Sequence, residues 1–159
     1  GNLKYNMESC DIVAEVSEAV MTLTDTAKKQ GVFLEYNEPE SMPAVVADAG
    51  RMQQVFVNII SNALKYTSAG GHILVDVKEE IGYVLIMVSD NGRGIPEADL
   101  DKVKQKFYKA EGSVRGSGIG LALADEIVKN HGGRLEISST ENIGTTVSIM
   151  LPQKPKSEN

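Results

Sequence analysis

A short turn, Asp90-Asn91-Gly92-Arg93-Gly94-Ile95-Pro96, carries residue types suited to ligand binding. It follows an apolar run from Tyr83 to Ser89 that is typical of a buried strand. Because glycine tolerates positive φ and has no side chain, a ligand can approach such a turn closely. Asp90 shares strand parity with Val84 and Ile86, so its carboxylate is expected at the edge of an apolar layer. A carboxylate there needs a partner, either a structural amide or a ligand's amino group, although the turn alone is more typical of an ordinary β-turn.

A second polar group lies along a helix that we expect from about Ala49 to Tyr66. The apolar residues of this segment recur at i, i+3, i+4 and i+7, which indicates one core-facing side. At about 100° per residue, Asn58, Asn62, Lys65 and Tyr66 fall within one other sector. Two amides and an ammonium in line can hold a hydrated cation and a phosphate chain. An isolated stripe of this kind is more often a solvated face.

A third candidate is the segment Gly116-Ser117-Gly118-Ile119-Gly120, which opens a helix expected to end at Asn130. Backbone N–H groups at such a helix start can face an anion. The spacing is similar to a dinucleotide fingerprint, but that motif needs a strand directly before it, and here a polar stretch precedes it. We expect this stretch to be a lid that is mobile from Lys104 to Arg115, the alternative being a long surface loop.

Composition limits the classes of function. The chain has 159 residues, 42% of them hydrophobic, and a net charge of −6, which favours one globular domain and argues against a nucleic-acid partner. A single cysteine, Cys10, excludes an internal disulfide, and two histidines leave little material for a zinc site. The sequence has no apolar run long enough to span a bilayer, so we expect no direct membrane insertion.

Periodicity and capping residues predict the elements that position these groups. Asp11 is a plausible N-cap for a helix that ends at Gly31, and Asp48 caps the next helix. A hairpin turn at residues 79–82 makes the strands on either side of it antiparallel neighbours. The expected strands are residues 32–36, 44–47, 73–78, 83–89, 134–139 and 145–151.

Taken together, the motifs resemble the ATP-binding catalytic domain of sensor histidine kinases, a Bergerat-fold family, over about Asp11 to Leu151. Each motif alone is only moderately specific, whereas their order and spacing together are a strong signal. Asn58–Thr67 is similar to the family's N box, and Asp90–Pro96 is similar to its first glycine box. Lys106–Lys109 is similar to the F box, and Gly116–Ala124 is similar to the second glycine box. Gly144-Thr145 is similar to the final glycine motif.

The resemblance implies an α/β two-layer sandwich in which three helices cover one face of a mixed, mostly antiparallel sheet of about five strands, with an ATP lid. It also implies a domain organisation. Residues 1–10 would be a linker from an upstream dimerisation domain, residues 11–152 the catalytic domain, and residues 153–159 a polar tail.

The family roles carry over to matching positions. Asn62 would bind the Mg²⁺ that bridges the phosphates of ATP, with Asn58 and Lys65 supporting metal and phosphates. Tyr66 would pack near the nucleotide, and Asp90 would accept a hydrogen bond from the adenine amino group.

The glycines of the two boxes would serve the same ligand. Gly92 and Gly94 would let the base in, and Gly116, Gly118 and Gly120 would form a phosphate-facing lid hinge. The other nucleotide contacts implied by the resemblance are Ile95, Phe107, Ile119, Leu121 and Thr145.

The F box departs slightly from the family pattern, because many members have Arg where Lys109 stands. Lysine keeps the charge but loses the bidentate fork, which Arg115 is near enough in sequence to supply. Contact with the γ-phosphate therefore falls to Lys109 or Arg115, and the sequence leaves this choice open.

Asn58 favours transfer over hydrolysis, because the related ATPases carry a water-activating Glu at this position and a neutral amide is a poor general base. We therefore expect Mg-ATP binding and γ-phosphoryl donation to a histidine on a separate dimerisation domain. The resemblance further implies two-component signalling to a response regulator, from the cytoplasmic portion of a sensor. The alternatives are a nucleotide-binding regulatory module without transfer activity and an anti-sigma-type serine kinase.

Neither histidine of the chain fits the family's acceptor, which lies mid-helix beside an acidic residue. His72 starts a strand, and His131 precedes the Gly132-Gly133 helix cap. We expect His131 to be a favourable cation at a helix C-terminus, and we expect this chain not to phosphorylate itself.

Overall fold

The computed structural model describes residues 4–98 and 115–153, and only the backbone of residues 115–120. The F-box residues Phe107 and Lys109 and most of the predicted lid lie outside the described residues. Within the described part, no helix is both long and apolar enough to cross a membrane.

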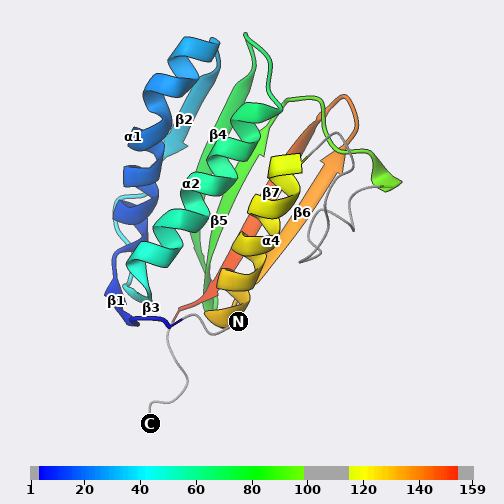
Figure 1. Cartoon of the computed structure of the whole chain (residues 1–159). Coiled ribbons are helices and arrows are strands. Elements are labelled where there is room, and N and C mark those ends of the chain that lie inside the picture. Colours follow the sequence, from blue (N-terminus) through cyan, green and yellow to red (C-terminus); the bar gives the residue numbers. More distant parts are fainter. Residues whose placement is uncertain (1–3, 99–114, 154–159) are drawn as a thin grey trace.

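The described chain forms a sheet covered on one face by helices, as the sequence predicts. Figure 1 shows α1 (Ile12–Gln30), α2 (Ala49–Lys65) and α4 (Arg115–Asn130) side by side on the same face. The five strands beneath them are, in spatial order, β2 (Phe33–Asn37), β4 (His72–Glu80), β5 (Tyr83–Asp90), β7 (Gly144–Pro152) and β6 (Arg134–Thr140).

The pairing of the strands agrees with the predicted mixed sheet. β2 runs parallel to β4, and the three other neighbouring pairs are antiparallel, including the hairpin of β4 and β5. A separate two-stranded sheet joins β1 (Glu8–Cys10) to β3 (Val45–Ala47). A segment before α1 is thus paired with a segment that precedes α2.

The core forms because strand and helix periodicities place apolar side chains in one layer. Alternate residues of β5, such as Val84 and Val88, are buried beneath the helices. The apolar side of α2, which includes Ile59 and Leu64, is buried against them. Asp90, the last residue of β5, has the parity of the buried valines and is half-buried.

Side chains fix the helix ends at the predicted positions. The Asp11 carboxylate accepts the N–H of Ala14 at 3.2 Å at the start of α1, which ends at Gly31 with φ 76°. The Asp48 carboxylate accepts the N–H of Arg51 at 3.0 Å at the start of α2. These caps satisfy backbone groups that have no partner within the helix.

His131 closes α4 by binding two backbone groups. Its Nδ1 lies 2.8 Å from the carbonyl oxygen of Ile127, and its Nε2 lies 3.0 Å from the backbone nitrogen of Asp48. Because a backbone N–H can only donate, Nε2 must accept, and the proton is on Nδ1. The ring is therefore neutral, and the expectation of a cation at this helix end is wrong. The residue is also buried, with only 7% of its surface exposed.

The residues before α1 pack onto the same corner. The Tyr5 ring lies edge-on to His131, with centroids 5.4 Å apart, and the Tyr5 hydroxyl accepts a hydrogen bond from Asn130 at 3.0 Å. The N–H of Asn6 donates to the Asp48 carboxylate at 2.8 Å. This bond is the largest of the contributions that hold the pKa of Asp48 below its usual range. Residues assigned to a linker are thus bound to the domain.

Candidate functional site

A narrow cleft opens between the carboxyl-terminal half of α2 and the sheet, where β5 ends. Its cavity volume is about 10 Å³, room for about one water molecule, within about 270 Å³ of space that includes open solvent. The residues that line it are Ile59, Asn62, Ala63 and Tyr66 of α2, Val88 and Asp90 of β5, Ile95 of the following turn, and Thr145 and Val147 of β7. The cleft therefore brings together five predicted site residues: Asn62, Tyr66, Asp90, Ile95 and Thr145.

Two local periodicities produce this convergence. Asp90 lies directly opposite Thr145 in the antiparallel pair of β5 and β7, and Val88 lies opposite Val147 on the same face. On α2, the lining residues are spaced by three or four positions, which places them on one side of the helix. The cleft therefore has a polar end at Asp90 and an apolar floor. This arrangement is typical of small-molecule sites.

The Asp90 carboxylate is the charged group of the cleft. Its Oδ1 accepts the N–H of Gly92 at 2.8 Å. Burial raises the pKa of Asp90, and backbone hydrogen bonds from Gly92 and Thr145 oppose that rise without cancelling it. An ionised carboxylate has room for further donors, so a ligand N–H can also bind there.

Gly92 and Gly94 let the turn fit between two other segments of backbone. A Cβ added at Gly92 would clash with the carbonyl oxygen of Tyr66. A Cβ at Gly94, which has φ 74°, would clash with the carbonyl of Thr140. These contacts account for both glycines without a ligand, and their predicted role in admitting the base stays a prediction.

Hydrogen bonds to two strands distant in sequence hold this turn in place. Asn91 Oδ1 accepts the N–H of His72 at 2.8 Å, and Ser139 Oγ accepts the N–H of Ile95 at 2.7 Å. Ser139 also lies 2.8 Å from the hydroxyl of Thr145. The polar end of the cleft is therefore built on bonded, fixed groups, which suits recognition of a rigid ligand.

The predicted phosphate-binding groups belong to α2 and to the start of α4. Asn58 is one helical turn before Asn62 and partly exposed, and Lys65 is exposed. The amino-terminal end of α4 lies at the same end of the molecule as the carboxyl-terminal end of α2 (Figure 1). The backbone of Gly116, Gly118 and Gly120 forms the first turns of α4.

Several predicted contacts are not brought to the cleft or are not described. Leu121 is 2% exposed and belongs to the apolar core. The side chains of Arg115 and Ile119 lie outside the described part, as do Phe107 and Lys109 entirely. The choice between Lys109 and Arg115 as the γ-phosphate contact is therefore untested.

Asn62, the predicted Mg²⁺ ligand, lies at the cleft, and its role in binding the metal stays a prediction. Among them, no group of three His, Cys, Asp or Glu side chains is placed to hold a metal. Asn62 supplies an amide oxygen beside the cleft. Mg²⁺ is commonly held by one or two protein oxygens together with phosphates and water, so this donor is sufficient in kind.

Sequence reasoning missed the apolar floor, Ile59, Ala63, Val88 and Val147, although signals for it were present. The two helix residues are three or four positions from Asn62 or Tyr66, and the two strand residues share parity with Asp90 or Thr145. It also missed Arg93, whose guanidinium carbon lies 4.6 Å from the centroid of the Tyr66 ring. Nothing in the spacing of these two residues predicts that contact.

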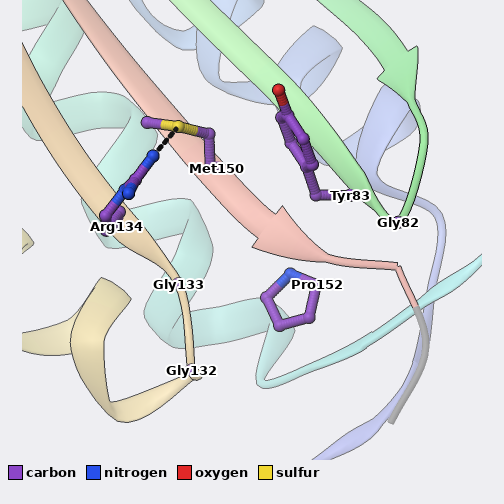
Figure 2. Close-up of a pocket in the computed structure, with 7 residues that line it drawn as sticks. All are labelled: Gly82, Tyr83, Gly132, Gly133, Arg134, Met150 and Pro152. Atoms are coloured by element: carbon purple, nitrogen blue, oxygen red, sulfur yellow. Dashed lines mark hydrogen bonds between the residues drawn. The ribbon is translucent and has the colours of Figure 1, made fainter. Parts of the chain in front are cut away.

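A second hollow lies where β5, β6 and β7 meet the end of α4 (Figure 2), and none of the predicted site residues lines it. Its lining residues are Gly82, Tyr83, Gly132, Gly133, Arg134, Met150 and Pro152. Arg134 there donates to the Met150 sulfur at 3.4 Å and pairs with Glu136 at 3.5 Å. The cleft at Asp90 is therefore the better candidate site.

Comparison with known proteins identifies a matching family and several relatives of this chain. Residues 47–155 match the family described as histidine kinase-, DNA gyrase B- and HSP90-like ATPases. The chain is 38% identical over 162 residues to the sensor histidine kinase WalK of Bacillus subtilis (strain 168). It is 30% identical over 152 residues to the alginate biosynthesis sensor protein KinB of Pseudomonas aeruginosa. These matches cover 98% and 96% of this chain but 26% of each relative, so the chain spans about a quarter of their length.

Solved structures share the fold. The catalytic domain of histidine kinase ThkA, in a nucleotide-free form, matches with a TM-score of 0.83 and 24% identity, over 96% of this chain and 99% of that one. Full-length ShkA in complex with AMPPNP matches with a TM-score of 0.82 and 22% identity, over 96% of this chain and 32% of ShkA. This likeness confirms the predicted two-layer sandwich.

Proposed function

The chain belongs to the histidine kinase-, DNA gyrase B- and HSP90-like ATPase family, and we propose that it binds Mg-ATP in the cleft at Asp90. The family match confirms the resemblance drawn from the sequence motifs. The observation that carries the proposal is the half-buried Asp90 carboxylate at the end of an apolar cleft. It offers an acceptor to a flat ligand that has an N–H group on its edge.

Adenine fits this description better than guanine. Its exocyclic amine is a donor, whereas guanine has a carbonyl oxygen at the corresponding position, which would face the carboxylate. The apolar floor of Ile59, Ala63, Val88 and Val147 would cover the ring faces. Asp90 would thus select the base.

The phosphates would extend from this base site along α2 toward the first turn of α4. Asn62 and Asn58 would lie beside them, and the N–H groups at the start of α4 would face them. Bound Mg²⁺ would neutralise phosphate charge. Catalysis would then consist mainly of positioning, since phosphoryl transfer asks little covalent chemistry of the protein.

The phosphoryl acceptor would be a histidine on a separate dimerisation domain of the same protein, followed by a response regulator. Asn58 supports transfer over hydrolysis, because its amide cannot act as a general base toward water. The 26% coverage of WalK and KinB leaves room in their chains for such domains.

A two-step experiment tests the proposal. Calorimetric titration of the chain with MgATP, MgADP and MgGTP should show binding of the adenine nucleotides and a clear preference for them over GTP. The chain, γ-labelled ATP and a histidine-bearing helical hairpin should then give acid-labile label on the hairpin. Absence of heat with any nucleotide at millimolar concentration refutes ATP binding. Binding without transfer favours the regulatory module.

A further inference from the structure

Arg93 contacts Tyr66 in two ways. Its backbone N–H donates to the Tyr66 carbonyl oxygen at 3.1 Å, and its guanidinium lies over the Tyr66 ring, 4.6 Å from the centroid. The distance is within the range of a cation–π interaction. The Arg93 side chain is exposed, and the turn that carries it is anchored to neighbouring strands through Asn91 and Ile95.

Tyr66 is the residue at which α2 ends, so the helix fixes it less firmly than it fixes Asn62. Its backbone angles, φ −101° and ψ 6°, are already non-helical. Tyr66 is partly exposed and lines the cleft together with Asp90 and Thr145. Because Tyr66 lines the cleft, a change in the position of its ring would change the shape of the base site, and the Arg93 guanidinium over the ring restricts that position.

We propose that Arg93 is a positioning residue of the base site, which holds the Tyr66 ring as one wall of the cleft. The inference rests on the proposed function, since it concerns affinity for the adenine base. Arg93 acts through Tyr66 and not through the phosphates. Its turn is attached to the base end of the cleft beside Asp90, whereas the phosphates extend toward α4.

The two roles predict different dependences on the ligand. If Arg93 acts through Tyr66, its removal weakens AMP, ADP and ATP by the same factor, because all three carry the same base. If its charge met the phosphates directly, the factor would grow from AMP to ATP. It would also shrink as salt is added, because exposed charges are screened.

The experiment compares Arg93→Met, Arg93→Lys and the control Arg134→Met by calorimetric titration with AMP, MgADP and MgATP at two salt concentrations. Arg134 is an exposed arginine of the second hollow, and its replacement removes the same charge away from the cleft. Arg93→Met should raise Kd about two- to five-fold for each nucleotide. Arg93→Lys should have a smaller effect and Arg134→Met none.

A double-mutant cycle with Tyr66→Leu completes the test. In the Tyr66→Leu protein, Arg93→Met should have no further effect on Kd. A factor that grows with phosphate number, or one that persists without the tyrosine ring, overturns the positioning role while leaving nucleotide binding intact. Wild-type protein that binds none of the three nucleotides refutes the proposed function itself. Thermal unfolding of each variant shows that altered affinity does not come from lost folding.

Discussion

The backbone N–H of Asp48 donates to Nε2 of His131 at 3.0 Å, so the residue after α4 holds the residue before α2. α2 begins at this corner and α4 ends there, and the opposite ends of both helices lie at the end of the domain that carries the cleft (Figure 1). A single neutral imidazole therefore links two helices on which the proposed nucleotide site depends.

Replacing His131 should destabilise the domain. In His131→Ala, the Asp48 N–H and the Ile127 carbonyl lose their side-chain partner, and the edge-on contact with Tyr5 is lost. A buried polar group left without a partner costs about 1–3 kcal/mol, so we expect a loss of about 2–3 kcal/mol in the free energy of unfolding. Urea unfolding measures it. His72→Ala, at an exposed site, is the control and should change stability far less.

Replacing Asp90 by asparagine should weaken binding of adenine nucleotides. The carboxylate accepts from the amine, whereas the amide offers a weaker, neutral acceptor. A hydrogen bond to a charged group contributes about 1.5–3 kcal/mol, so we expect Kd to rise about ten- to a hundred-fold. Calorimetry with MgADP measures this. Equal affinities of the wild type for ATP and GTP would contradict the assigned role of Asp90.

The same substitution should affect stability in a pH-dependent way. Because burial raises the pKa of Asp90 above its ordinary value of 3.8, the folded state binds this proton more tightly than the unfolded state. The contribution of Asp90 to stability therefore falls as the pH rises from the pKa of the unfolded state to the higher pKa of the folded state. Above that pKa the contribution stays unfavourable. Asp90→Asn lacks this contribution, so its stability relative to the wild type should increase between about pH 4 and pH 7. If the difference in unfolding free energy between wild type and Asp90→Asn did not change with pH, burial would not destabilise the Asp90 carboxylate.

A methyl group at Gly92 should disturb both the fold and the cleft. In Gly92→Ala, the new Cβ would meet the Tyr66 carbonyl and must displace the turn or the end of α2. We expect a loss of about 1–3 kcal/mol in stability and weaker nucleotide binding. Gly50→Ala is the matched control, because a Cβ there meets only ordinary contact with Asp48 and alanine favours the helix. If Gly92→Ala and Gly50→Ala had the same free energy of unfolding, the turn would have moved to accommodate the new Cβ without cost.

The chain alone should not acquire phosphohistidine. Both ring nitrogens of His131 are engaged by backbone groups, and the ring is buried. The ring of His72 is stacked on Phe33 at an exposed strand start, with centroids 4.9 Å apart, and His72 is not among the residues that line the cleft. Incubation with γ-labelled ATP should therefore give no acid-labile label until a histidine-bearing hairpin is added. Stoichiometric label on the chain alone would contradict this.

Features set by neighbouring residues were predictable from the sequence. The caps at Asp11 and Asp48 and the parity of Asp90 with Val84 depend on short spacings, and the structure has each as expected. The five predicted residues that line the cleft follow from the same periodicities together with the family motifs. Local pattern and global fold agree at these positions, which is typical of natural sequences.

Features that depend on distant contacts were not predictable in this way. The charge state assigned to His131 was wrong because its partner, the Asp48 N–H, is 83 residues away in sequence. The contact of Arg93 with Tyr66 likewise depends on how a turn meets the end of a helix. No periodicity encodes such a meeting, so it had to be seen in three dimensions.

The docked segment before α1 has a consequence for where the domain can be cut. β1 supplies the only pairing partner of β3 among the described strands, and Cys10 at its end is buried. A shortened version that starts at Asp11 would leave the edge of β3 open and remove Tyr5 and Asn6 from their sites on Asn130 and Asp48. We therefore expect the folding unit to extend back at least to Tyr5, so that an expression or proteolysis boundary placed at the first helix would fall inside it.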